Sequence, residues 1–356
     1  MHKREDAFSC MDDCCGNSVH CQWVCPRNPK HFVDHLREIN GFDLANIPRA
    51  AVLPRARLPG YAPYVYHGNR RAGPLAADAV AIPLHKLYRR RDGDLRYRDR
   101  AEITAAFGVS ADAKLIVIGS GRDTPIEAWW RLSSRRRGLA AELATLGLDL
   151  ATSLNYSLFI DQTRYEDLYN IKRIGVAWQE IVDAGQPCAL HLNARTVRDY
   201  ERLADFVGVR DEVTDVSFEF GTGAGWTARR PFHERQLGLL AQRVGRPLRI
   251  VMIGGAPAVP AIAAAYPDVV YIDTTAFMKA VNRQQIVESN NLKLKAVAVL
   301  TLVNQPIDNV LHSNVEVMKR RFARILKESR TIHSATGKPP TSEIPDSRAS
   351  AQVERS

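Results

Sequence analysis

Short apolar runs of about five to seven residues alternate with amphipathic stretches of about 12 to 20 residues from position 113 onward. This rhythm is typical of repeated strand–helix units. The predicted strands cover 115–118, 156–160, 188–192, 213–220, 248–253, 269–272 and 296–302, and an earlier strand covers 79–84. The predicted helices cover 125–146, 164–184, 195–207, 232–244, 258–265, 275–289 and 312–328.

Most of these strands are apolar on both faces, as strands covered by helices must be. Eight such parallel strands surrounded by helices predict a TIM-type (β/α)8 barrel. An open, doubly wound parallel sheet is the alternative, because a sequence pattern does not show whether the sheet closes.

Four regions follow from composition. Residues 1–45 form a cysteine-rich module with a short helix near 31–36, and residues 46–112 form a basic segment, rich in proline and arginine, that joins the barrel. The barrel is expected at 113–331, and residues 332–356 are polar enough to be disordered. No apolar stretch approaches the roughly 20 residues of a membrane span, and the N-terminus has no signal-peptide core. We therefore expect a cytoplasmic protein that does not contact membranes.

The charge is uneven along the chain. Lys and Arg number 49 against 39 Asp and Glu, which gives a net charge of +10. Eleven basic residues and only four acidic ones lie between positions 54 and 100, where tyrosines are interleaved with the arginines. Arginines bind phosphates and aromatic rings stack on bases, so this pattern favours nucleic acid as a partner. A solvated basic surface without a partner is the alternative.

Five of the six cysteines fall in one short run: Cys10, Cys14, Cys15, Cys21 and Cys25. In a chain without a secretion signal, such a cluster indicates metal ligation before disulfides. The end of the run, Cys21-x3-Cys25-Pro26, matches the end of a bacterial ferredoxin motif, but its start does not. An iron–sulfur cluster is the first interpretation, and a structural zinc site is the second.

Polar residues follow most of the predicted strands, where the active sites of barrels lie. Asp161 and Glu219 end or interrupt apolar strands, so a desolvated carboxylate suited to acid–base or nucleophilic chemistry is expected at each. His191 is either catalytic or a hydrogen-bonded core residue. Asp123 and Asp273 are further catalytic candidates, with helix capping as the alternative role.

The same strand ends carry candidates for binding substrate or phosphate: Arg122, Arg164, Asn193, Arg195, Gly221, Gly223, Gly225, Gly254 and Gly255. Glycine-rich loops let backbone amides approach an anion. Simple tight turns explain glycines equally well. The spacing matches neither a P-loop nor a dinucleotide fingerprint, and the signatures of kinases, α/β-hydrolases and zinc metalloproteases do not occur in the chain.

The segment Asn155-Tyr156-Ser157-Leu158-Phe159-Ile160-Asp161, followed by Leu168-Tyr169-Asn170-Ile171-Lys172-Arg173, resembles an uncharacterised family of phage and mobile-element proteins, domain of unknown function 4417. The resemblance covers roughly residues 80–255. It implies the barrel fold and nominates Asp161, without naming a reaction.

A weaker, fold-level likeness is to tRNA-guanine transglycosylases and their DNA-modifying relatives, which are barrels with aspartate nucleophiles. It rests on Ile253-Gly254-Gly255 and on Val270-Tyr271-Ile272-Asp273-Thr274-Thr275. Together these features predict an enzyme that acts on nucleic acid or on a nucleotide-like substrate, with base modification as one reaction. The alternative is a non-catalytic nucleic-acid-binding accessory protein with a structural metal module.

Overall fold

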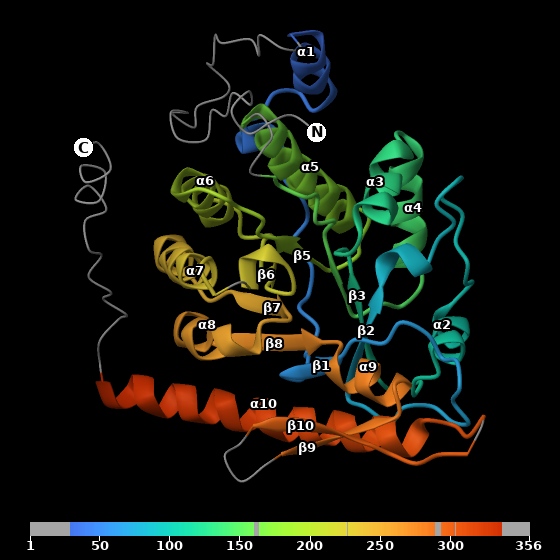
Figure 1. Cartoon of the computed structure of the whole chain (residues 1–356). Helices are drawn as coiled ribbons and strands as arrows, with labels where there is room; N and C mark the ends of the chain where they lie inside the picture. Colours follow the sequence, from blue (N-terminus) through green and yellow to red (C-terminus); the bar gives the residue numbers. More distant parts are fainter. Residues whose placement is uncertain (1–28, 160–163, 226, 289–292, 303, 337–356) are drawn as a thin grey trace, which may run out of the picture.

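Eight short parallel strands follow one another around a ring whose outside is covered by helices (Figure 1). The computed structural model describes residues 29–159, 164–225, 227–288, 293–302 and 304–336. The ring consists of β1 (Tyr61–Pro63), β2 (Ala79–Pro83), β3 (Lys114–Ile118), β4 (Leu150–Thr152), β5 (Cys188–His191), β6 (Asp215–Glu219), β7 (Arg249–Ile253) and β8 (Asp268–Asp273).

Strand β1 closes the ring. On one edge it pairs in parallel with β8, and the Tyr64 amide just beyond it donates to the Asp273 carbonyl at 2.8 Å. On the other edge Tyr64 forms a parallel bridge with Ala81 of β2, and the Val65 amide donates to the Ala81 carbonyl at 2.8 Å. The sheet has both ends joined, so the predicted TIM-type barrel is confirmed and the open doubly wound sheet is excluded.

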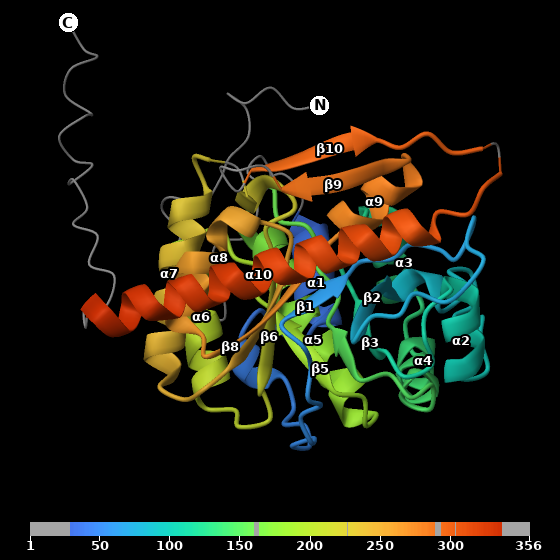
Figure 2. The same ribbon diagram turned by 90° about the horizontal axis from the view of Figure 1, so that it is seen from below.

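Helices occupy most of the segments between strands. They are α1 (Pro29–Glu38), α2 (Arg100–Phe107), α3 (Asp123–Arg131), α4 (Arg135–Ala144), α5 (Arg164–Asp183), α6 (Val197–Gly208), α7 (Arg230–Val244), α8 (Val259–Ala265), α9 (Thr275–Val281) and α10 (Asp308–Thr336). Short 3-10 turns are η3 (Leu44–Asn46), η4 (Leu84–Lys86), η5 (Gly223–Gly225) and η6 (Ala256–Ala258). The long helix α10 crosses the barrel and packs on α8, α9 and β1 (Figure 2). Among the described helices, none is long and apolar enough to cross a membrane.

Two predicted strands are wrong. Residues 153–159 form no strand, and the fourth strand of the barrel is β4, which ends at Thr152. The run predicted at 296–302 belongs instead to an antiparallel hairpin of β9 (Gln284–Glu288) and β10 (Leu294–Ala298) outside the barrel. The remaining barrel position is taken by β1, which is too short and too rich in proline to show a strand pattern in the sequence.

Two predicted helices also differ from the structure. The helix predicted at 125–146 is divided into α3 and α4, because Ser133 between them adopts a left-handed conformation with φ of 50°. The helix predicted at 275–289 ends at Val281, and β9 follows it.

The basic segment 46–112 is part of the barrel, since it supplies β1, β2 and α2. Several of its arginines serve the fold. Arg71 donates to the Gly108 carbonyl, and Arg100 donates to Ala113 and pairs with Asp149 at 3.1 Å. At the other end, α10 continues through the predicted boundary at 331/332 to Thr336. The cysteine run and residues 337–356 lie outside the described residues.

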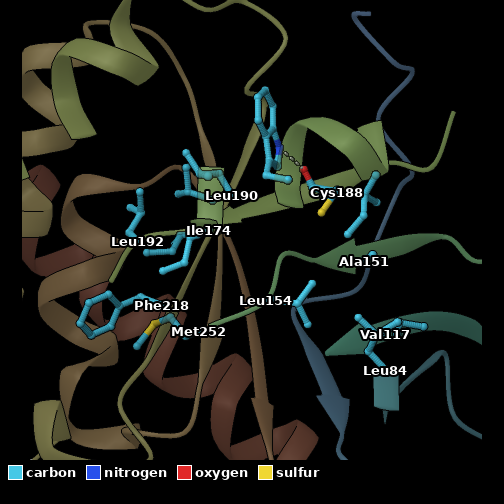
Figure 3. Packing of buried hydrophobic residues seen from close by; sticks show 14 of the residues in the cluster. Leu84, Val117, Ala151, Leu154, Ile174, Cys188, Leu190, Leu192, Phe218 and Met252 are labelled. Carbon is cyan, nitrogen blue, oxygen red and sulfur yellow. Dashed lines mark hydrogen bonds between the residues drawn. The ribbon is translucent and has the colours of Figure 1, made fainter. Parts of the chain in front are cut away.

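The core has two parts. Small apolar side chains fill the inside of the barrel: Ala62, Ala79, Ala81, Ile116, Ile118, Leu150, Ala189, Val251, Ile253, Val270 and Ile272. The outward-facing residues of the strands pack against the helices, as Val117, Leu190 and Met252 do in Figure 3. In this outer layer the Trp178 indole donates to the Cys188 carbonyl at 3.0 Å. The alternation of the strand residues thus separates inside from outside.

A buried ion pair lies at the amino ends of β6 and β7. Asp215 and Arg249 are opposite each other in the strand register, and the Arg249 guanidinium donates to the Asp215 carboxylate. Arg249 also donates to the Ala56 carbonyl at 2.6 Å, and the Arg55 side chain lies 3.7 Å from the same carboxylate. The segment that enters β1 is thereby tied to the base of the barrel.

Replacing Asp215 with Asn should lower the free energy of unfolding by about 3 kcal/mol, because the Arg249 guanidinium then stays buried without its nearest carboxylate. Denaturant unfolding measures the change. The control is Asp205→Asn, which breaks an exposed pair with Arg243 and should cost less than about 1 kcal/mol. Equal losses in the two variants would contradict the structural role of the buried pair.

Candidate functional site

A chain of polar side chains joins three loops at the carboxyl end of the barrel. Glu219 is the last residue of β6, and the Asn155 side-chain amide donates to its Oε2 at 3.0 Å. The Asn193 amide donates to Asn155 Oδ1 at 2.7 Å and to the Tyr156 carbonyl at 2.9 Å. The loops after β4, β5 and β6 therefore converge on one carboxylate.

Glu219 is desolvated without an opposite charge beside it in the part of the chain that the structure describes. Burial raises the pKa of this carboxyl group, and the hydrogen bond from Asn155 opposes the rise. The Ser120 hydroxyl also lies near the carboxylate and lowers its pKa, although the two groups do not form a hydrogen bond of ordinary geometry. A carboxyl group with a raised pKa holds its proton to a higher pH and is a stronger base once ionised, a property that general acid–base catalysis uses.

Two tyrosines face Glu219 from the strand β1 side of the barrel mouth. Burial raises the pKa of both Tyr64 and Tyr66, and the negative charge of Glu219 adds to the effect. Their rings lie close together, with centroids 4.8 Å apart. The site thus combines one carboxyl group, two phenols and two amides, which is enough to move a proton and to orient a polar substrate.

The structure places His191 one step deeper, inside the barrel. Its Nδ1 lies 3.0 Å from the Ser217 hydroxyl, and its backbone amide donates to the Ser153 hydroxyl at 2.9 Å. Burial lowers the pKa of His191 to about 3. The position of His191 matches the alternative of a hydrogen-bonded core residue, because its ring is enclosed below the level of Glu219.

Asp273 faces the outside of the barrel, away from the mouth. It accepts hydrogen bonds from the hydroxyls of Tyr61 and Tyr271 at 3.4 and 3.2 Å and from the Thr275 amide at 3.2 Å. These bonds match the alternative role of supporting the start of a helix, here α9. The aspartate that carries the likeness to the transglycosylases therefore points away from Glu219.

Of the two remaining predicted carboxylates, the structure describes Asp123 but not Asp161. Asp123 is exposed in the first turn of α3, where it accepts a hydrogen bond from the Ser157 hydroxyl. It lies on the mouth side of the barrel but has no described contact with Glu219. Asp161 lies outside the described residues, so its predicted role stays a prediction.

The predicted binding arginines are used in different ways. Arg164 is buried and donates to the Asp199 carboxylate, with Asp167 also near, so it is not available to a substrate. Arg195 is half-buried and donates to the Leu158 carbonyl at 3.2 Å. Arg122 is exposed just before α3, where it can reach a ligand.

The predicted glycines have a packing role that the sequence did not distinguish from anion binding. A Cβ on Gly255 would lie 2.1 Å from the Phe220 Cβ, and one on Gly225 would lie 2.0 Å from the Phe220 carbonyl oxygen. Gly254 adopts a φ of 70°, and its added Cβ would contact Gly221. The loops after β6 and β7 thus pack backbone to backbone. Gly223 has open space around it, so packing does not explain that position.

Several site residues were missed in the sequence. Asn155 was placed just before a strand predicted at 156–160, whereas the barrel strand β4 ends at Thr152, so Asn155 was not recognised as a residue of the loop after that strand. Tyr64 and Tyr66 follow a strand that showed no pattern. His67 and His85 also lie in the loops after β1 and β2, and each has a buried Nδ1 without a hydrogen-bond partner among the described residues.

Basic residues surround these two histidines. Burial lowers the pKa of His67, and Lys86, Arg70 and Arg71 lower it further. Burial likewise lowers the pKa of His85 to about 4, with contributions from Lys86 and Arg90. The ring of His85 lies next to Gly121 in the loop after β3. The mouth therefore carries positive charge on the side formed by β1, β2 and β3.

The residues predicted to hold a metal, Cys10, Cys14, Cys15, Cys21 and Cys25, lie outside the described residues, so both the iron–sulfur cluster and the zinc site stay predictions. Within the described residues, His31, His35 and Glu166 bring three possible metal-ligating atoms within 4.8 Å of one another. Burial lowers the pKa of His35 against the opposing effect of Glu166.

Fold and mouth define a (β/α)8 barrel protein with a buried carboxyl group, that of Glu219, at the carboxyl end of its strands. No family model and no curated protein matches the chain, so the resemblance to domain of unknown function 4417 has no further support. Among solved structures, the tryptophan synthase alpha chain from Legionella pneumophila subsp. pneumophila is similar with a TM-score of 0.38 and 10% identity, over 83% of this chain and 97% of that chain. The assignment of the fold rests on the strand pairing described above.

Replacing Glu219 with Gln should make the protein more stable at pH 7 than the unsubstituted chain. Because the folded-state pKa is raised, the wild-type chain loses stability as pH rises through that pKa, whereas the glutamine does not titrate. Below a pH of about 4 both side chains are neutral and the two proteins should converge. Denaturant unfolding at several pH values measures the difference.

The control is Glu201→Gln, which neutralises an exposed carboxylate on α6. It should change the free energy of unfolding by less than about 0.5 kcal/mol at each pH. A Glu219→Gln variant that is less stable than wild type at pH 7 would show that the carboxylate supports the fold instead.

Proposed function

We propose that this barrel is an enzyme that acts on a phosphate-bearing, nucleotide-like substrate at its carboxyl end, with Glu219 as the general acid–base. The observation that carries the proposal is the Glu219 carboxylate itself. It is desolvated, it has no described cationic partner, and Asn155 holds it in one orientation. A charged group in this state lowers stability, and such groups are typically kept where they perform chemistry.

In this proposal, Glu219 takes a proton from the substrate and later returns one. Asn155, itself held by Asn193, keeps the acceptor oxygen in place while the proton moves. The hydroxyl of the half-buried Tyr66 supplies a donor for a substrate oxygen beside the carboxylate. Proton transfer by one positioned group typically accounts for a factor of about 10² to 10⁴ in rate.

The substrate class follows from the charges and rings around the mouth. Arg70, Lys86, Arg90 and Arg122 are exposed on the loops after β1, β2 and β3, and an anionic group such as a phosphate would neutralise them. The half-buried ring of Tyr66, packed against the buried Tyr64, offers an aromatic surface at the inner side of that rim. Modification of a base within a nucleic acid is one reaction of this class.

Glu219→Gln should lower kcat by at least about 100-fold on any substrate that the protein turns over, while the substrate still binds. The measurement is a turnover screen of purified protein against nucleotides and oligonucleotides, followed by kinetics of the variant. Glu201→Gln should keep the wild-type rate, since that carboxylate lies on the outer surface. Binding without turnover across the screen would favour the non-catalytic accessory protein instead.

Replacing Arg70, Lys86 and Arg90 together with Gln should weaken binding of a single-stranded oligonucleotide and reduce the dependence of log K on log salt by about two. The control replaces Arg57, Arg243 and Lys327, which changes the net charge equally on surfaces away from the mouth. Salt titrations of binding compare the two triple variants. Equal effects would show that overall charge, and not the mouth, attracts the polyanion.

A further inference from the structure

Two histidines and a glutamate meet where α1 packs against the beginning of α5. His31 and His35 are four residues apart on α1, so their rings project from one face with centroids 3.9 Å apart. Glu166, in the first turn of α5, faces both rings. The distances are 3.2 Å from His31 Nδ1 to Glu166 Oε1 and 3.5 Å from His35 Nδ1 to Glu166 Oε2.

These separations match the spacing of ligands around a single zinc ion. Bonds of about 2.0–2.1 Å in a tetrahedral arrangement place neighbouring ligand atoms about 3.3–3.4 Å apart. Each nitrogen lies close to that distance from one oxygen of the Glu166 carboxylate, and one possible ligand atom from each of the three residues lies within 4.8 Å of the other two. The side chains are therefore already arranged as ligands.

The arrangement is less well explained as hydrogen bonding alone. The Nδ1 atom of His35 is buried and makes no hydrogen bond to any described residue, although it points toward the carboxylate. A buried polar atom without a partner costs free energy that a bound cation would recover.

Neighbouring aromatic residues fix the orientation of the two imidazoles. The Tyr169 ring stacks on His35 with centroids 3.8 Å apart and an interplanar angle of 6°. The Tyr165 ring lies edge-on to both imidazoles, with centroids 6.2 Å apart in each case, and the Tyr169 hydroxyl donates to Glu38, which lies on α1 with the two histidines. Rings that are held in place lose little entropy when they bind a metal.

We propose that His31, His35 and Glu166 form a zinc-binding site that fastens α1 to α5. Two imidazole nitrogens and one carboxylate oxygen are ligands that zinc accepts, and a water molecule completes the tetrahedron. The site joins elements 131 or more residues apart in the sequence, so the bound ion adds a cross-link to the fold.

The test is zinc binding by the full chain in which the five N-terminal cysteines are replaced by serine, so that thiolates do not contribute. Competition with a chromophoric chelator should show one bound equivalent. Glu166→Gln and His35→Ala in this background should each weaken zinc binding by at least about tenfold. Asp34→Asn, which neutralises an exposed residue on α1, should bind zinc as the parent does.

X-ray absorption on the zinc-loaded parent should show a shell of nitrogen and oxygen atoms. If the serine background does not fold, the unsubstituted protein serves, and its nitrogen and oxygen coordination to zinc must fall in His35→Ala. Zinc stoichiometry, affinity and coordination that stay the same in both Glu166→Gln and His35→Ala would overturn the proposal.

Discussion

Closure of the barrel by a strand of three residues is the constraint on which the rest of the structure depends. β1 contributes few hydrogen bonds of its own, yet the amides of Tyr64 and Val65 satisfy carbonyls on β8 and β2 at the same time. Because the ring closes there, Tyr64 and Tyr66 face Glu219, which lies on β6, across the mouth. In an open sheet these strands would stand apart, and the phenols and the carboxylate would not share one environment.

Inside the ring, polarity changes from one end to the other. The Asp215–Arg249 pair lies at the amino end, and Ser217 with His191 forms a neutral hydrogen-bonded group further along, level with the apolar Val251. Glu219 follows two residues after Ser217 along the same strand. Among the inward-facing residues of β6, Asp215 is neutralised by Arg249 and Ser217 carries no charge. Glu219 is therefore the inward-facing carboxylate of this strand without a described cationic partner. The raised pKa is a consequence of this layering.

Repeated sequence patterns predicted most of the barrel strands, whereas the strand that closes the barrel and the residues next to it were missed. Strands β5, β6, β7 and β8 were found because buried parallel strands are continuous apolar runs. β1 was missed because three residues bounded by prolines have no period, and β10 was misplaced because an apolar run does not say which sheet it joins. The error at β4 had the largest effect on the site, since it concealed Asn155. Glu219 and Asn193 lie at the mouth, where the sequence placed them, because they stand at or just after the ends of well-patterned strands, whereas the inward or outward orientation of His191 and Asp273 required the register.

Helix α5 connects the two candidate sites physically. Its first turn carries Glu166, which faces α1, and its second carries Asn170, whose amide donates to the Ser157 carbonyl at 2.8 Å. Ser157 belongs to the same loop as Asn155, and residues 153–159 of that loop form no strand. Together with Asn193, which holds Asn155 and the Tyr156 carbonyl, α5 therefore helps to fix the loop that places Asn155 at Glu219. An ion bound between α1 and α5 would restrain the helix at the end nearest this loop, so a site remote from the mouth would help to keep Asn155 aligned with Glu219.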